Sequence, residues 1–156
     1  MRRSTALLSA LAAALLAGDA LACGESLFRV GRGVSFREYT APLPGNVLVV
    51  ANTESELAMA ERLAAAGHDV HVVPDPSAIR SEIENSGHAF DVVLAYFSQR
   101  NVIEAQTAST SVEFIPVARE GAEEAQAKAL YVRHLPDQGS VKQFLKTIHA
   151  ALRARA

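Results

Sequence analysis

The chain has 156 residues, of which 49% are hydrophobic and 21% are charged, and its formal net charge is −2. This composition is typical of one compact globular domain and excludes a disordered or fibrous chain. The Lys and Arg residues are scattered along the chain, so they offer no basic face to nucleic-acid phosphates or to an anionic membrane. A nucleic-acid-binding function is therefore not expected.

Residues 1–22 have the pattern of a secretory signal peptide. Arg2 and Arg3 follow the initial Met1, the apolar run ALLSALAAALLAG comes next, and the segment ends in the small-x-small sequence Ala20-Leu21-Ala22, as a cleavage site does. The apolar run is shorter than the roughly 20 residues that a helix needs to span a bilayer. We therefore expect cleavage after Ala22, export to a periplasmic or extracellular location, and a mature chain without a transmembrane helix.

Cys23 is the only cysteine and would be the first residue of the mature chain. A single thiol excludes an intrachain disulfide, although exported proteins meet an oxidising compartment. The thiol could carry a lipid anchor, form an intermolecular disulfide or act in redox chemistry, or it could have no role. Asp19 and Ala20 disfavour the lipid anchor, because the residues before a lipidated cysteine are usually apolar and include a branched aliphatic one. A redox role predicts loss of function when Cys23 is replaced by Ser.

Residues 23–45 differ in character from the rest of the chain. Two strand-like runs, residues 27–30 and 34–39, flank Gly31-Arg32-Gly33, and glycines supply the positive φ angles that a tight turn needs. Pro42 and Pro44 then interrupt the extended chain. This segment is expected to form a β-hairpin arm followed by a linker.

From Asn46 onward, apolar strand-like runs alternate with helix-like stretches. The predicted strands are residues 47–50, 70–73, 91–95, 113–118 and 129–133. Helices are predicted after the first, second, fourth and fifth strands, whereas residues 99–109 form a looser segment. Because right-handed crossovers join parallel strands, we expect residues 46–156 to form one α/β domain. Its architecture would be a doubly wound, flavodoxin-like sheet of five parallel strands in the order 2-1-3-4-5.

Two of the predicted helices begin with the same capping signal. Thr53 is followed three residues later by Glu56, and Ser140 by Gln143, which is the spacing of a capping box. The last helix also carries apolar residues at helical spacing, which predict a stripe that faces the core. The stripe consists of Val141, Phe144, Leu145, Ile148 and Leu152.

The segment from Asn46 to Arg153 resembles the receiver domain of two-component response regulators. The stretches that carry the likeness are, in chain order, NVLVVANTESEL, LAAAGHDVHVV, FDVVLAY, EFIPVA, and ALYVRHLP with FLKTIHAAL. The resemblance implies phosphoryl transfer to an aspartate at the end of the third strand. It also implies an acidic pair that holds Mg²⁺ after the first strand, a hydroxyl residue after the fourth, and a lysine before a proline after the fifth.

The chain departs from the receiver pattern at each of these positions. Ala51-Asn52 stands in place of the acidic pair, Tyr96 in place of the phosphorylated aspartate, Arg119-Glu120-Gly121 where the hydroxyl residue is expected, and Leu135 where the lysine precedes Pro136. Mg²⁺ binds through oxygen ligands, chiefly carboxylates, and a phenol is not the carboxylate nucleophile that forms an acyl phosphate. The resemblance therefore implies a pseudo-receiver that keeps the fold and loses the phosphorylation chemistry, and no cofactor is expected.

A candidate binding pocket is predicted at the carboxyl ends of the strands, where open α/β sheets bind ligands. The residues predicted there are Asn52, Thr53, Tyr96, Ser98, Arg119, Glu120 and His134. Arg119 and the helix that begins after Asn52 could bind a small anion, or the group could recognise a protein. These residues could instead have ordinary structural roles. Arg119 and Glu120 would be solvated loop charges, Asn52 and Thr53 helix caps, and Tyr96 a side chain that fills the place of the phosphorylation site.

Neither a metal site nor catalysis is expected from the spacing of the polar residues. His68 and His71 lie on either side of a predicted helix-to-strand turn, and His88 and His134 come from separate loops, so no helical pair of ligands is formed. Ser98 has His134 as a conceivable base, but the Gly-x-Ser-x-Gly elbow that presents such a nucleophile is missing.

Taken together, these patterns predict an exported receiver-like module that acts by noncovalent interaction, with a protein partner or with itself. The predicted contact face belongs to the fourth and fifth β/α units and includes Glu123, Lys128, Tyr131, Arg133 and the last helix. The N-terminal hairpin could extend the sheet edge by strand pairing. The alternative is a small-ligand-binding protein, or an enzyme of minor activity, that uses the candidate pocket.

Overall fold

The structure is a computed structural model, and it describes residues 40–155. The predicted signal peptide, Cys23 and the hairpin arm lie outside the described residues. Within that range, no helix combines the length and the apolar character needed to cross a membrane.

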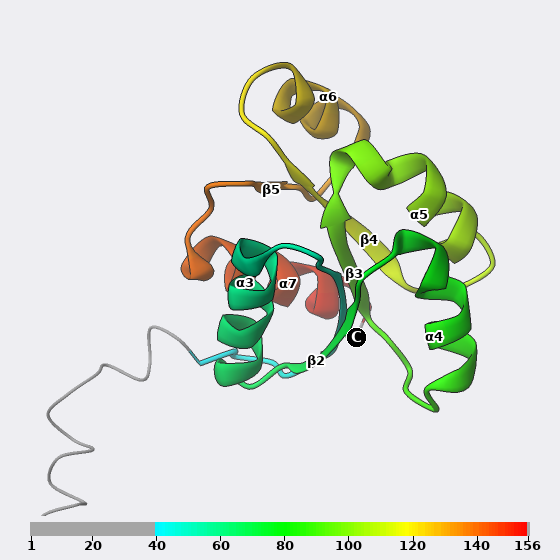
Figure 1. The fold of residues 1–156 in the computed structure, drawn as a ribbon. Coiled ribbons are helices and arrows are strands. Elements are labelled where there is room, and N and C mark those ends of the chain that lie inside the picture. The colour runs from blue at the N-terminus through cyan, green and yellow to red at the C-terminus, as the bar shows by residue number, and fades with distance from the viewer. Residues whose placement is uncertain (1–39, 156) are drawn as a thin grey trace, which may run out of the picture. The chain divides into compact units, whose positions relative to one another are not determined.

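Five parallel strands form one sheet in the order β2-β1-β3-β4-β5. This is the flavodoxin-like arrangement predicted from the sequence, with β1, β3 and β4 in the interior and β2 and β5 at the edges; Figure 1 shows the sheet between the helices. The strands are β1 (Asn46–Val50), β2 (Asp69–Val73), β3 (Val92–Tyr96), β4 (Glu113–Ala118) and β5 (Leu135–Pro136). Val47 pairs with Val92, and Val92 with Glu113, so the amino-terminal ends of β1, β3 and β4 lie at the same edge of the sheet.

Burial explains why the central strands are continuous aliphatic runs. All but one residue of β1 and all but one of β3 are buried, because helices cover both faces of a parallel sheet. The edge strand β2 buries only Val73, and its sequence DVHVV accordingly mixes polar with apolar residues. The polarity of each strand thus follows its position in the sheet.

Four of the five described helices cover the two faces in pairs (Figure 1). They are α3 (Glu54–Ala65), α4 (Ile79–Asn85), α5 (Arg100–Thr107), α6 (Ala122–Leu130) and α7 (Val141–Arg155), with 3₁₀ turns η2 (Pro76–Ala78) before α4 and η3 (Phe97–Gln99) before α5. α3 and α7 pack on one face and contribute Leu63 and Ile148 to its core. α4 and α5 pack on the other face, through Ile79 and Ile103. The fifth helix, α6, packs through Ala127 against Phe97 and Ala118.

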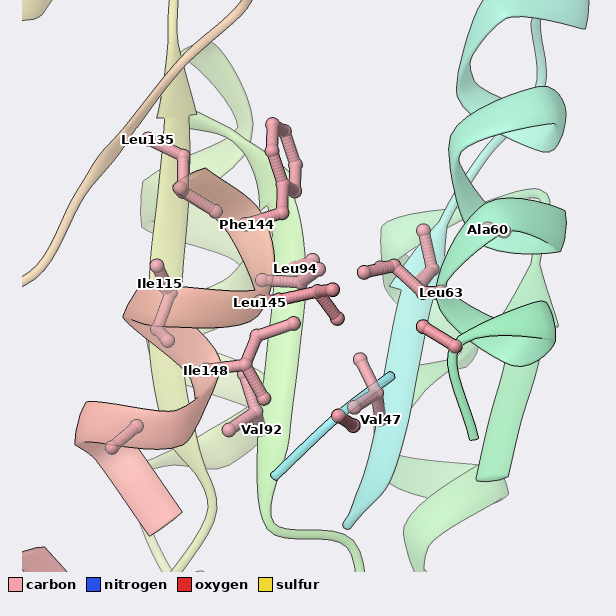
Figure 2. Close-up of a cluster of buried hydrophobic side chains, with 14 of the residues drawn as sticks. Val47, Ala60, Leu63, Val92, Leu94, Ile115, Leu135, Phe144, Leu145 and Ile148 are labelled. Atoms are coloured by element: carbon pink, nitrogen blue, oxygen red, sulfur yellow. The ribbon is translucent and has the colours of Figure 1, made fainter. Parts of the chain in front are cut away.

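The core under α3 and α7 is the larger of the two. Leu63 of α3, Ile148 of α7 and Val47 of β1 are fully buried, and their side chains point toward the same space between helices and sheet (Figure 2). The predicted apolar stripe of the last helix is confirmed, since all five of its members are buried. Full burial of such a side chain contributes about 1.5–3 kcal/mol to folding.

Both predicted capping boxes are confirmed. The Glu56 carboxylate accepts the backbone N–H of Thr53 at 2.8 Å, and the Thr53 hydroxyl accepts the N–H of Glu56 at 3.4 Å. Ser140 and Gln143 repeat the exchange at 2.8 and 3.4 Å. Each pair satisfies N–H groups that the first turn of a helix leaves without a partner.

The strand predicted at residues 129–133 is wrong. α6 continues to Leu130, because AEEAQAKAL consists of residues with high helix propensity, and the fifth strand is only Leu135–Pro136. The apolar run that suggested a strand is not buried: Leu130 is 65% and Val132 94% exposed. The prediction took an exposed connection for a core strand.

Three smaller differences concern the boundaries of elements. The segment 99–109 contains α5, which buries Ile103 and Thr107. The helix predicted from Ser77 begins instead as the 3₁₀ turn η2, whose first residue is a proline, and continues as α4. The third strand extends one residue beyond the prediction, and its last residue is Tyr96.

Candidate functional site

Most of the residues predicted for the candidate pocket follow the carboxyl ends of strands, whereas His134 precedes β5 and lies at its amino end. Tyr96 is the last residue of β3, Asn52 and Thr53 lie between β1 and α3, and Arg119 and Glu120 follow β4. Parallel strands bring their carboxyl ends to one edge of the sheet, so residues far apart in the sequence meet there.

Tyr96 is the centre of this group. Its hydroxyl donates a hydrogen bond of 2.5 Å to Oδ1 of Asp137, which follows β5. The guanidinium of Arg119 lies over the ring, 5.2 Å from its centroid, in a cation–π contact. Burial, together with the hydrogen bond and charge of Asp137, raises the pKa of Tyr96 to about 12. The phenol is therefore neutral at physiological pH and acts as a hydrogen-bond donor rather than as a nucleophile.

The start of α3 is already occupied by a carboxylate of the same chain. Glu56 accepts the backbone N–H groups of Asn52 and Thr53 at 2.7 and 2.8 Å. An exogenous anion at this helix N-terminus would have to displace Glu56 and overcome its negative charge. The anion site that the sequence suggested at Asn52 and Thr53 is thus filled by the cap itself.

A small pocket lies between α3, α7 and the ends of the strands. Its volume is about 80 Å³, and its lining residues are Val49, Val50, Ser55, Glu56, Met59, Leu63, Leu94, Ala95, Tyr96, Val117, Asp137 and Phe144. Pockets that hold drug-sized ligands or cofactors usually measure about 300–1,000 Å³. This volume suits a few water molecules or a very small solute, not a nucleotide.

The predicted site residues separate into two groups. Tyr96 contacts Arg119 directly, and Asn52 and Thr53 are hydrogen-bonded to Glu56, which lines the same pocket as Tyr96. The other three lie apart: Ser98 is exposed in η3, Glu120 is exposed on the loop after β4, and His134 lines a second groove.

Two lining residues that matter were not among the predicted ones. Glu56 was assigned only a capping role, and Asp137 was missed because the fifth strand was placed too early in the chain. A strand end at Pro136 would have put Asp137 at the same edge as Tyr96.

The second groove runs along the edge strand β5. Its volume is about 350 Å³, and its lining residues are Val132, Arg133, His134, Leu135, Pro136, Gln143, Lys146, Thr147 and Ala150. β5 contributes one wall and α7 the other. The side chains are a mixture of basic and apolar groups.

The two predicted partner-binding residues next to this groove make contacts within the chain. Tyr131 donates a hydrogen bond to Glu104 of α5, and its ring packs edge-on against Phe114 with a centroid separation of 5.5 Å. Burial and the Glu104 carboxylate raise the pKa of Tyr131. Arg133 forms an ion pair of 2.8 Å with Glu113 of β4. Both residues hold the α6–β5 connection against the sheet.

Comparisons with known proteins give no relative: neither a protein-family model nor a curated protein nor a solved structure matches the chain significantly.

Proposed function

We propose that this chain is an exported receiver-like module that cannot be phosphorylated and that works by binding a protein partner noncovalently. The flavodoxin-like strand order and the receiver-like stretches support the receiver assignment, and the N-terminal pattern of a signal peptide supports export. The groove of about 350 Å³ between β5 and α7 carries the binding function.

The arrangement around Tyr96 supports the loss of phosphorylation. Receiver chemistry needs a free carboxylate and a divalent cation at the end of the third strand. The carboxylates that line the pocket are both engaged: Asp137 accepts the Tyr96 hydroxyl, and Glu56 caps α3. We expect acetyl phosphate with Mg²⁺ to leave the intact mass of the protein unchanged, and a stable phosphoryl adduct would refute this part of the proposal.

Size and exposure favour a partner in the second groove. Its volume falls within the range of binding pockets, and the adjacent Val132 is 94% exposed. A side chain so exposed is accessible to a partner that enters the groove. The 80 Å³ pocket at Tyr96 lacks this capacity.

Charge favours an acidic, extended segment as the partner. Arg133 also lines the groove but is already paired with Glu113. The available cations are Lys146, which lines the groove, and Lys142, one helical turn before it on α7. Carboxylates of a partner would meet these cations while its apolar side chains cover Val132. Strand pairing along β5 can contribute little to the binding free energy, because Pro136 has no N–H to donate. The affinity must therefore come mainly from side-chain contacts.

Synthetic peptides test this directly. Extended peptides that alternate Glu with aliphatic residues, and the same peptides with Lys in place of Glu, are titrated against the full chain. We expect the acidic series to bind and the basic series to fail. Val132→Asp and Lys146→Glu should each weaken binding at least about tenfold, a change of about 1.4 kcal/mol in binding free energy.

Matched substitutions away from the groove serve as controls. Val102→Asp on α5, where the residue is 42% exposed, and Arg62→Glu in the last turn of α3, where the residue is exposed, introduce the same changes of polarity and charge and should leave binding unaltered. Equal binding of both peptide series, or equal effects of groove and control variants, would contradict the proposal. A dimer that Val132→Asp dissociates, detected by sedimentation, would identify a second copy of the chain as the occupant instead.

A small-molecule-binding function is the alternative that the same protein can test. A ligand that binds only the folded state raises the unfolding free energy by RT ln(1 + [L]/Kd). Thermal stabilisation by a metabolite, abolished by Tyr96→Phe, would support this alternative and contradict the peptide-binding proposal.

A further inference from the structure

We propose that Asp69, His71 and His88 form a binding site for a divalent transition-metal ion such as Zn²⁺. These three residues, the His–Asp cluster, lie at the amino-terminal side of the sheet, away from Tyr96. One ligand atom from each lies within 4.8 Å of the others. The proposal does not depend on the peptide-binding function.

The fold brings the cluster together from two separate segments. Asp69 and His71 are two residues apart on β2, and alternate residues of a strand point to the same face. That face is the one covered by α4, since His71 packs edge-on against Phe90 at 5.1 Å. His88 comes from the loop before β3, and its ring centroid lies 4.5 Å from that of His71.

The Asp69 carboxylate lies between the two imidazoles. Its Oδ1 is 3.7 Å from Nε2 of His71, and its Oδ2 is 3.8 Å from Nδ1 of His88. Ligand atoms at the usual Zn–N and Zn–O distances of about 2.0–2.2 Å are roughly 3.3–3.5 Å apart in a tetrahedral site. The two imidazole ligand atoms are within 4.8 Å of each other, so side-chain rotations that shorten the separations by up to roughly 1.5 Å would close the cluster on an ion.

Glu82 of α4 is not itself one of the proposed ligands, but its carboxylate lies beside the ring of His71. Its Oε1 lies 3.4 Å from Nδ1 of His71. A carboxylate on one ring nitrogen keeps the proton there, so the other nitrogen presents its lone pair to the metal. In His71 that other nitrogen is Nε2, the atom that faces Asp69.

The ligand atoms of the cluster determine which metal ion it is expected to bind. Two imidazoles and one carboxylate match zinc and related transition metals rather than Mg²⁺ or Ca²⁺, which prefer oxygen ligands. Three protein ligands leave the fourth tetrahedral position open to water or to a donor from a partner. The side chains of Asp69 and His88 are 56% and 44% exposed, so an ion can reach the cluster from solvent.

Isothermal titration of the full chain with ZnCl₂ tests the site. Every sample carries Cys23→Ser, so that the thiol does not bind the metal. We expect one ion per chain, and His88→Asn should reduce the affinity more than about tenfold. Glu82→Gln should reduce it about 10–100-fold, as the loss of a carboxylate behind a ligating histidine does.

Controls separate this site from unspecific binding by histidine. His134→Gln replaces a histidine outside the cluster and should leave stoichiometry and affinity unchanged. Co²⁺ should give the visible absorption of a tetrahedral nitrogen–oxygen site in the parent protein and lose it in His88→Asn. His88 lies on an exposed loop, so its replacement keeps the fold, and an unchanged thermal melt without metal verifies this. Absence of one-to-one binding, or equal effects of His88→Asn and His134→Gln, would overturn the proposal.

Discussion

The hydrogen bond between Tyr96 and Asp137 should stabilise the whole carboxyl edge of the sheet. It joins the end of β3 to the residue after β5, 41 positions later in the chain, at 2.5 Å. Tyr96→Phe removes only the hydroxyl and keeps the ring under Arg119. A hydrogen bond to a charged group contributes about 1.5–3 kcal/mol, and the partial exposure of both side chains reduces this to about 1–2 kcal/mol.

Chemical denaturation of four proteins measures this contribution. The free energies of unfolding of the parent, Tyr96→Phe, Asp137→Asn and the double variant give the coupling between the two side chains. We expect a coupling of about 1 kcal/mol or more, and a melting temperature lower by roughly 4–8 °C per kcal/mol lost. Glu120 is an exposed carboxylate at the same edge of the sheet, so Glu120→Gln should leave the free energy of unfolding nearly unchanged. A coupling near zero would show that the bond does not hold the edge together.

The ionisation of Tyr96 provides a second readout of the same contact. Its pKa is about 12 in the folded chain and near 10 when unfolded, so the unfolded chain loses the proton first. The free energy of unfolding should therefore fall as the pH rises above about 10. Asp137→Asn should lower the pKa of Tyr96 only in part, because the effect of burial remains. NMR of the tyrosine ring measures this pKa.

Three further predictions concern the core and the turns. Ile148→Ala should lower the free energy of unfolding by about 2–5 kcal/mol in urea, because the side chain is fully buried; a loss below 1 kcal/mol would contradict the packing. Burial lowers the pKa of His68, so the unfolded chain binds the proton first and stability should decline below about pH 6.5; denaturation curves of His68→Gln should decline less over that range. Gly139→Ala should destabilise by about 1–3 kcal/mol, since a Cβ there would lie 2.8 Å from the carbonyl oxygen of Pro136; an unchanged melting temperature would refute this.

The binding groove and the His–Asp cluster lie at different places on the sheet. The groove runs along β5, at one edge, and the cluster is built on β2, at the other. Substitutions at one place should not affect binding at the other. The two proposals can therefore fail independently.

Local patterns predicted much of this fold because their physical causes are local. The aliphatic runs of β1 and β3 indicated strands buried on both faces. The pairs Thr53/Glu56 and Ser140/Gln143 indicated helix starts, since a capping box acts within four residues. The strand order followed from the alternation of strands and helices together with the resemblance to receiver domains.

Prediction from local sequence patterns failed where a segment could be either a strand or a loop and only its burial decides between the two. Leu130 and Val132 are apolar, yet both are exposed: Leu130 is the last residue of α6, and Val132 lies between α6 and β5. Two residues, Leu135 and Pro136, are enough to form the fifth strand because β4 supplies their partners. So short a strand has no periodicity to detect.

By itself, the sequence determined the α/β class, the starts of α3 and α7 through their capping boxes, and the tyrosine at the end of the third strand. The tertiary structure alone decided which distant side chains meet: Asp137 with Tyr96, and Asp69 with His88. The physical reason is that crossover connections and strand register set these distances, and neither leaves a mark in the spacing of residues along the chain. Chemistry built from neighbours in sequence can be read directly, whereas chemistry built across strands requires the fold.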